Sequence, residues 1–175
     1  MPTRFEGFPR TLERSSLRPG RWFSASFKRG PTVCFATGVG EGAARTILTF
    51  KPVRADELEF MPVPLAEMSG AFATIEDELV LAPGLGPDAA RLIAPEKRPF
   101  LSGSLLRLSN GDMGMGYADG ADRELVLVSL STGERASGFD LVFDRWSLSL
   151  RRGASERMVG CFRGLRDRAH RFQET

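Results

Sequence analysis

The fold is decided by residues 105–133, which read LLRLSNGDMGMGYADGADRELVLVSLSTG. Short apolar runs alternate here with three turn signals, Asn110-Gly111, Asp119-Gly120 and Ser131-Thr132-Gly133. Asn-Gly and Asp-Gly pairs accept the positive φ angles that tight hairpin turns require. The pattern therefore predicts neighbouring antiparallel strands over 105–109, 113–118 and 124–130, with a fourth strand beside the third.

The segment that follows the third turn carries a change of phase. Apolar side chains occupy odd positions and then even positions: Phe139, Leu141, Phe143, Trp146, Leu148 and Leu150. Because side chains alternate between the two faces of a strand, one strand cannot change parity without an irregularity. We therefore expect a turn or a bulge at Asp144-Arg145.

The first part of the chain also has the pattern of strands. Residues 22–28 alternate with phenylalanine on one face, and residues 32–37 and 46–50 are β-branched and aromatic runs that flank a glycine-rich loop. The loop, residues 38–43, formally fits the dinucleotide pattern G-x-G-x-x-A. Such a site needs the glycines to open a helix, whereas the run that follows predicts a strand, so we expect a hairpin here.

Two segments carry signals for helix. Residues 87–93 begin with proline and predict one or two helical turns. Near the chain end, one helical stripe holds the apolar residues Met158, Cys161, Phe162, Leu165, Ala169 and Phe172. The sequence thus predicts an all-β fold, an antiparallel meander sandwich or flattened barrel, with a C-terminal amphipathic α-helix over 154–172. Residues 20–175 are expected to form one domain, and residues 1–19 an extended or mobile arm.

Composition excludes several kinds of site. The 175 residues include one histidine, His170, and two cysteines, so the chain alone cannot build a histidine-rich or four-cysteine metal site. Cys34 and Cys161 are candidates for a single disulfide, or for two buried thiols in a reducing compartment. We expect no catalytic residue, no cofactor and no metal.

The charge is concentrated at the two ends of the chain. Residues 1–30 carry seven basic side chains against two acidic ones, and residues 145–175 carry eight arginines against three acidic side chains. Guanidinium groups suit bidentate contacts with carboxylate and phosphate. The candidate partner-binding residues are Arg151, Arg152, Arg163, Arg166 and Arg168. They favour a protein or other anionic partner, or a second copy of the chain. No aromatic residues interleave with them in a nucleic-acid motif, so nucleic acid is the less favoured partner.

Two further features bear on the compartment. No apolar run is long enough for a transmembrane segment, and residues 1–20 lack the apolar core of a signal peptide. We expect a periplasmic protein if the numbering starts after a signal peptide, and a cytoplasmic one otherwise.

These observations predict a non-enzymatic binding or structural β-domain that contacts its partner through the arginine-rich ends. One alternative is a small carboxylate-dependent hydrolase, for which Glu76, Asp77, Glu78, Asp140 and Asp144 are available. Another is a virion or secretion-apparatus subunit.

The order of several features resembles one protein family. Trp22 is followed by Cys34, a short helical segment at 88–93, a run from Gly133 to Leu150 that ends in Ser-Leu, and Cys161. This order is similar to that of the invasion-associated locus B proteins. The resemblance implies a small exported β-sandwich protein of bacterial origin with no catalytic residues to transfer.

Overall fold

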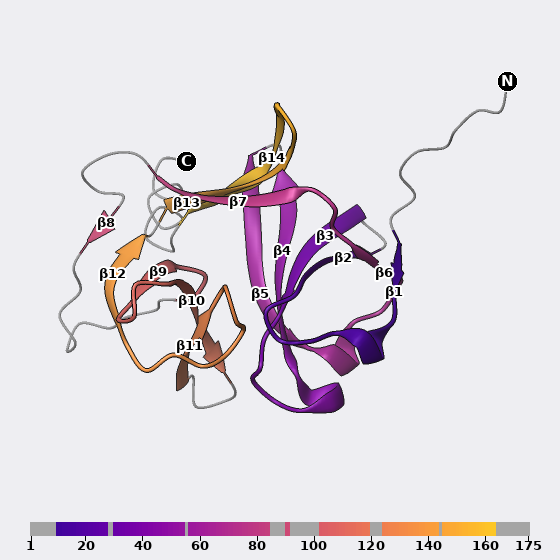
Figure 1. Ribbon diagram of the computed structural model, residues 1–175, viewed down its shortest axis with the longest axis horizontal. Helices are drawn as coiled ribbons and strands as arrows, with labels where there is room; N and C mark the ends of the chain where they lie inside the picture. Colours follow the sequence, from indigo (N-terminus) through magenta and orange to yellow (C-terminus); the bar gives the residue numbers. More distant parts are fainter. Residues whose placement is uncertain are drawn as a thin grey trace, which may run out of the picture.

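The computed structural model describes residues 10–27, 30–54, 56–84, 90–91, 102–119, 124–143 and 145–163. These residues fold almost entirely as strands, arranged in two sheets (Figure 1). All-β is therefore the class of this fold. In spatial order the larger sheet contains β1 (Thr11–Leu12), β6 (Phe72–Thr74), β2 (Trp22–Phe27), β3 (Gly30–Ala36), β4 (Thr46–Arg54), β5 (Glu57–Pro64), β14 (Ser155–Arg163), β13 (Arg145–Arg152) and β7 (Glu78–Pro83). The smaller sheet contains β11 (Glu124–Ser129), β10 (Met113–Asp119), β9 (Leu105–Leu108), β12 (Phe139–Phe143) and β8 (Ala90–Arg91).

The larger sheet curls toward a barrel. Strands β6 and β7 lie near its two opposite edges, yet only residues 75–77 connect them. Four peptide steps span at most about 14 Å, so the two edges must approach each other. Figure 1 shows β7 and the β13–β14 hairpin crossing over the ends of β3, β4 and β5. The curled sheet thereby gains an inner face and an open end.

The sequence predicted three of the strands in the smaller sheet correctly. Strands β9, β10 and β11 pair in that order as antiparallel neighbours, and the expected turn at Asn110-Gly111 joins β9 to β10. Gly120 of the expected Asp119-Gly120 turn lies outside the described residues. The predicted place of the fourth strand was wrong, because β12 pairs with β9 and not with β11. After the turn at Gly133, Arg135 forms a single antiparallel bridge with Val128 of β11, and the chain then crosses the end of the sheet and returns beside its first strand. This is the connection of a Greek key.

The phase change predicted at Asp144-Arg145 marks a change of sheet. Strand β12 ends at Phe143 in the smaller sheet, and β13 begins at Arg145 in the larger one. The hairpin predicted around the glycine-rich loop is confirmed, because β3 and β4 pair as antiparallel neighbours on either side of it.

The C-terminal helix is not present where the structure describes the chain. Residues Ser155–Arg163 form strand β14, which pairs with β13 along its length. The predicted helix is therefore wrong over this segment, and residues 164–172 lie outside the described residues. The misleading pattern has a local cause. Val159 is an extra residue between the paired Met158 and Gly160, and this β-bulge interrupts the alternation that would otherwise have indicated a strand.

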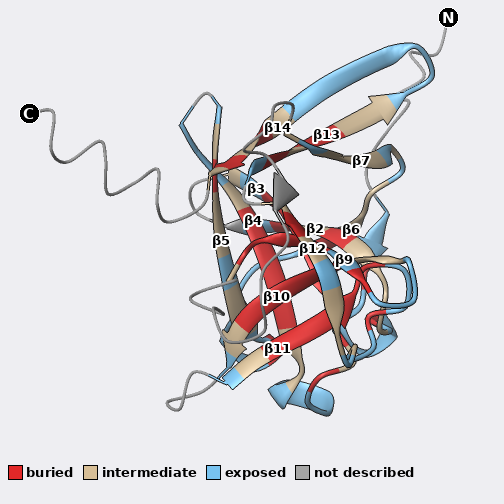
Figure 2. Cartoon of the chain, turned by 90° about the vertical axis from the view of Figure 1, so that its left-hand side faces the viewer, coloured by how far each residue is buried: buried red, intermediate tan, exposed pale blue. Residues whose placement is uncertain are grey.

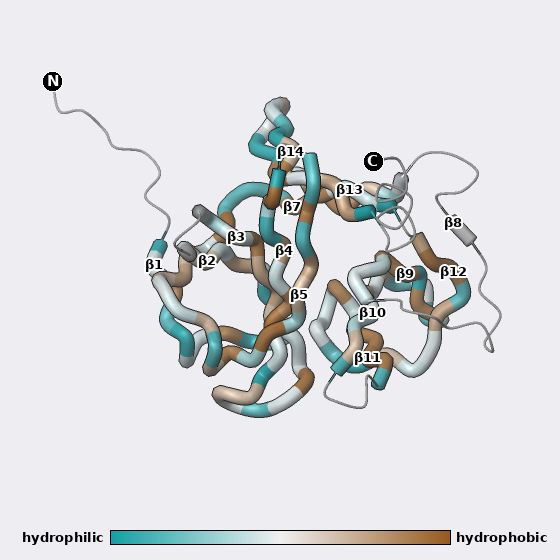
Figure 3. The backbone as a smooth tube through the Cα atoms, turned by 180° about the vertical axis from the view of Figure 1, so that it is seen from behind, coloured by the Kyte–Doolittle hydropathy of each residue, from teal (hydrophilic) through white to brown (hydrophobic). Residues whose placement is uncertain are grey.

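Both faces of the curled sheet are buried along β2, β3 and β4, whereas the tip of the β13–β14 hairpin is exposed (Figure 2). Its inner face packs against the smaller sheet in a core rich in aromatic residues: Phe35, Phe50, Tyr117, Trp146 and Phe162. The outer faces of β2, β3 and β4 carry a second cluster that includes Phe23, Cys34 and Phe72. Figure 3 shows from behind how the smaller sheet gathers on one side of β5 while β2, β3 and β4 lie on the other.

Two expected segments are only partly described. Residues 10–19, which we assigned to an N-terminal arm, lie against the second cluster: β1 pairs with β6, and Leu12 and Leu17 are buried. Residues 1–9 lie outside the described residues. Within the predicted helical turns at 87–93, Ala90–Arg91 form the short strand β8 beside β12, so the helix is wrong there. Residues 87–89 and 92–93 lie outside the described residues.

Candidate functional site

The inner face of the curled sheet changes character along its strands. On β13, Trp146 and Leu148 are buried, Leu150 is half-buried, and Arg152 is exposed at the end of the same alternation. At the level of Trp146 the sheet is closed, because its ring meets that of Phe50 edge to face at 5.8 Å. Further along the same face, at Leu150 and Arg152, the described lining contains no aromatic side chain. The inner face therefore opens into a mouth with arginine at its rim.

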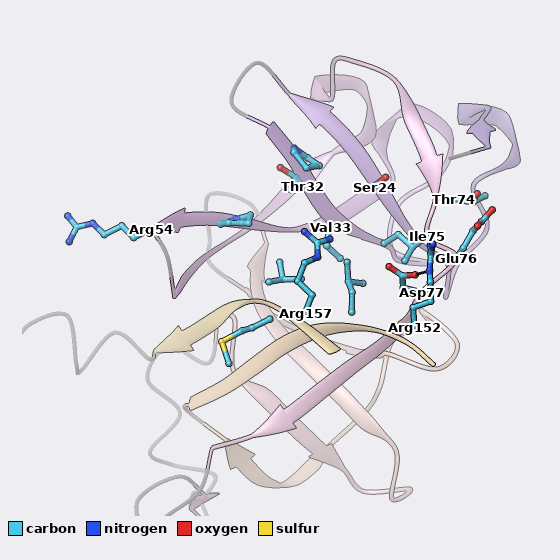
Figure 4. Close-up of a pocket in the computed structure, with 15 residues that line it drawn as sticks. Ser24, Thr32, Val33, Arg54, Thr74, Ile75, Glu76, Asp77, Arg152 and Arg157 are labelled. Carbon is cyan, nitrogen blue, oxygen red and sulfur yellow. Dashed lines mark hydrogen bonds and ion pairs between the residues drawn. The ribbon is translucent and has the colours of Figure 1, made fainter. Parts of the chain in front are cut away.

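A cavity of about 500 Å³ occupies this mouth, between β2, β3 and β4 on one side and the β13–β14 hairpin on the other (Figure 4). Its wall is mainly apolar at the bottom and charged at the rim. The apolar lining consists of Pro31, Val33, Pro52, Ile75, Leu150, Met158 and Val159. The charged lining consists of Arg54, Glu76, Asp77, Arg152 and Arg157, and three hydroxyl-bearing residues, Ser24, Thr32 and Thr74, complete the wall. The volume is in the range of small-molecule binding sites, and barrel mouths are a common place for them.

The hairpin of β13 and β14 places one exposed arginine, Arg157, in the wall of the cavity. Arg152 and Ser155 are paired, so the turn consists of Gly153 and Ala154, with Gly153 at a φ of +59°. The register then sets Arg157 directly opposite Leu150. Residues directly opposite each other in an antiparallel pair project from the same face. Arg157 therefore shares the inner face with Leu150, and both line the cavity.

The charges at the rim differ in their partners. Arg152 Nε donates to Asp77 Oδ1 at 2.5 Å, and Figure 4 shows the Asp77 side chain turned toward Arg152 while that of Glu76 points elsewhere. Arg54 extends away from the cavity. Arg157 reaches across the cavity toward Val33 and has no hydrogen bond or ion pair with any residue in the described part of the chain. It is thus the cation best placed to receive an anion here.

The structure separates the arginines that the sequence singled out. Arg151 and Arg152 end β13, Arg163 ends β14, and Arg166 and Arg168 lie outside the described residues. The three described ones all have acidic partners within the chain. Arg151 lies 3.1 Å from Glu156 and 3.6 Å from Glu78, and Arg163 lies 3.4 Å from Asp56. Such exposed pairs contribute roughly 0–1 kcal/mol each, so a partner can exchange them at little cost.

The described acidic residues that we considered for a hydrolase are divided between the cavity mouth and the smaller sheet. Asp77 is held by Arg152 at the mouth, and Glu78 lies beside Arg151. Asp140 is on the smaller sheet, where Arg107 binds both of its carboxylate oxygens. This guanidinium lowers the pKa of Asp140 and keeps the carboxyl ionised. Asp144 lies outside the described residues. Among the residues that the structure does describe, no group of histidine, cysteine and carboxylate side chains is arranged to hold a metal ion.

The two cysteines do not form a bridge. Both are free thiols, Cys34 on β3 and Cys161 on β14. Strands β4 and β5 lie between them, which corresponds to about 14 Å at normal strand spacing. A disulfide needs Cα atoms within about 7 Å. Burial raises the pKa of the Cys34 thiol to about 12, so this group is an unreactive part of the second cluster.

Sequence reasoning missed the residue that the geometry makes most prominent, Arg157. The missed signal was the pair Gly153-Ala154, which lies between two segments that each contain arginine. This pair fits a two-residue hairpin turn as well as the start of a helix. Val33, Ile75 and Val159 were not recognisable as neighbours, because they come from three distant segments of the chain. Only the pairing of β13 with β14 and the curl of the sheet bring them together.

Comparison with known proteins finds no match for this chain among family models, curated proteins or solved structures. The resemblance to the invasion-associated locus B proteins therefore stays a prediction. Within the described ranges no helix has the length and apolarity to cross a bilayer.

Proposed function

We propose that the protein is a non-enzymatic binding module that contacts an anionic partner through the arginines of the β13–β14 hairpin. The single observation that supports this most strongly is the position of Arg157. It projects into a cavity, its guanidinium is not neutralised by any described residue, and its donors are suited to a carboxylate.

The surrounding charges favour an anion over a cation. Asp77 already accepts a hydrogen bond from Arg152, and the side chain of Glu76 is not turned toward Asp77 in Figure 4. A cation that entered the mouth would meet Arg157 and Arg152 first. An anion would instead replace part of the hydration of two guanidinium groups that lie on the same hairpin.

The same arrangement supports binding over hydrolysis. Carboxylate-dependent glycoside hydrolysis needs two carboxyl groups that face each other at a defined separation across the scissile bond. At this mouth one carboxylate is engaged by Arg152 and its sequence neighbour points in another direction. A binding role requires only the unpaired guanidinium and the cavity beside it.

The test uses poly-L-glutamate as an anionic probe and poly-L-lysine as its opposite. We expect the protein to bind poly-L-glutamate with an affinity that falls with salt, and Arg157→Gln to weaken that binding several-fold. Arg135→Gln is the matched control, because it removes the same charge from an exposed arginine that lies beside β11 of the smaller sheet and not in the cavity lining. Equal binding of both polymers, or equal losses in the two variants, would contradict the proposal.

A further inference from the structure

We propose that the cavity at the mouth of the curled sheet is a binding site for an amphipathic monocarboxylate, with a medium-length hydrocarbon chain inside and the carboxylate on Arg157. This inference rests on the proposed function and names the chemical class of its ligand.

The bottom of the cavity is suited to hydrocarbon. Val33 belongs to the buried core, and Ile75 and Val159 pack against that core from the cavity side. Leu150 adds a fourth aliphatic side chain from β13. Ser24, Thr32 and Thr74 also line the cavity, but against the four aliphatic side chains the hydrogen-bonding groups of a sugar or a peptide backbone would stay unsatisfied, which is costly. A hydrocarbon chain loses nothing there and is removed from water.

The rim is suited to a single negative charge. Arg157 stands directly across the strand pair from Leu150, so a ligand whose chain contacts Leu150 has its head group at the guanidinium. Arg152 uses its Nε for Asp77, and a guanidinium has five N–H donors, so its remaining donors stay available to the same head group. One free guanidinium beside one already paired matches a monocarboxylate. A head group with two or more negative charges would need a second unpaired cation. Among the described lining residues, the remaining arginine is Arg54, which extends away from the cavity.

The size of the cavity agrees with this class of ligand. Its volume of about 500 Å³ is large enough for a medium-length chain and head group, and it is open to solvent, since Arg54, Arg152 and Arg157 of its lining are exposed. The aromatic level of Phe50 and Trp146 closes the bottom, which limits how far a chain can enter.

The experiment is titration calorimetry with decanoate below its micellar concentration, compared with 1-decanol and decyltrimethylammonium. We expect saturable binding of one decanoate, binding of 1-decanol weaker by about tenfold because it lacks the charge, and no binding of the cationic amphiphile. Arg157→Gln should weaken decanoate about tenfold and leave 1-decanol unchanged. Arg135→Gln, which removes the same charge from an exposed arginine outside the cavity lining, should leave both affinities within about twofold of the unmodified protein.

A substitution in the apolar lining of the cavity tests the contact with the hydrocarbon chain of the ligand. Leu150→Gln should weaken decanoate and 1-decanol alike, since both place the same chain against this side chain. If that variant does not fold, amide chemical shifts of the unmodified protein take its place. Decanoate should then move the signals of Val33, Ile75 and Val159, and signals that move only elsewhere would overturn the assignment.

The outcomes separate this inference from the proposed function. Absence of saturable decanoate binding, equal binding of the cationic amphiphile, or equal loss in Arg157→Gln and Arg135→Gln overturns the monocarboxylate site. If poly-L-glutamate binding still depends on Arg157, the binding module stands without this ligand. If neither probe depends on Arg157, both proposals fail.

Discussion

The two ends of the inner face of the curled sheet are built from the same strands, but one end is buried in the core and the other lines an open cavity. At one end Trp146 stacks on Phe162 at 5.5 Å and donates through Nε1 to the carbonyl of Gly103 at 2.8 Å, which ties the larger sheet to the chain entering the smaller one. At the other end β13 continues with Leu150 and Arg152, which line the cavity and are not covered by the described strands of the smaller sheet. The difference shows that a strand can pass from a buried core to an exposed surface within a few residues where the layer that faces it ends.

The largest effect is expected at the core end. Trp146→Ala removes a fully buried indole and its hydrogen bond and should lower the free energy of unfolding by about 3–5 kcal/mol. Leu150→Ala at the mouth removes a half-buried side chain and should cost about 1 kcal/mol. Urea unfolding of both variants measures the contrast. Equal losses would mean that the mouth is packed as firmly as the core.

A smaller effect is expected where β14 passes the core. A Cβ atom on Gly160 would lie 2.9 Å from Cγ of Leu58, so Gly160→Ala should cost about 1–3 kcal/mol through overpacking. Combining it with Leu58→Ala makes room, so the double variant should lose less stability than the sum of the two single variants. Strict additivity in urea unfolding would show that the contact is not tight.

The outer face of β3 gives a prediction for alkaline pH. The folded state raises the pKa of Cys34 from 9.0 to about 12, so above pH 9 the unfolded chain loses this proton while the folded chain keeps it. The stability that comes from the neutral thiol is complete below pH 9 and is lost as the pH rises toward 12, by at most about 1.4 kcal/mol per pH unit. Urea unfolding at several pH values between about 8 and about 10.5 measures this loss.

Cys34→Ala is the control for this dependence, since it removes the titrating group while every other group remains. We expect the difference in stability between the two proteins to change with pH above 9 and to be constant below it. A constant difference throughout would show that Cys34 is not held neutral by burial.

The smallest effect on stability is expected at the rim. Arg152→Gln breaks the contact with Asp77, but the arginine side chain is 69% exposed, so the free energy of unfolding should change by less than about 1 kcal/mol. Urea unfolding in low and high salt checks this, with a difference that shrinks as salt rises. A loss as large as that of Trp146→Ala would make the rim a structural element and remove the contrast between the two ends.

Sequence patterns predicted what depends on neighbouring residues. The turn at Asn110-Gly111 and the glycine-rich loop after β3 each join strands that are adjacent in the sheet, so local turn chemistry was sufficient to place them. The fourth strand of the smaller sheet was misplaced because its partner is chosen by packing across the whole sheet, which no turn signal encodes.

The site escaped prediction for two physical reasons. The bulge at Val159 breaks the two-residue period of β14, so its apolar residues fit a helical stripe by coincidence. The cavity then requires the sheet to curl until residues 75–77 can connect β6 to β7, and curling leaves no mark on the local sequence. The sequence therefore showed that residue 157 is an arginine, but it gave no sign that this arginine lines a cavity.

The most direct test of the mouth as a binding site is an NMR titration of the Arg157 side-chain Nε–H signal with decanoate. We expect a saturable shift of this signal, with the signals of Leu150 and Val159 moving in step and the indole signal of Trp146 unmoved. A moving Trp146 signal with an unchanged Arg157 would contradict a binding site at the mouth, because it would place the ligand in the core end of the sheet.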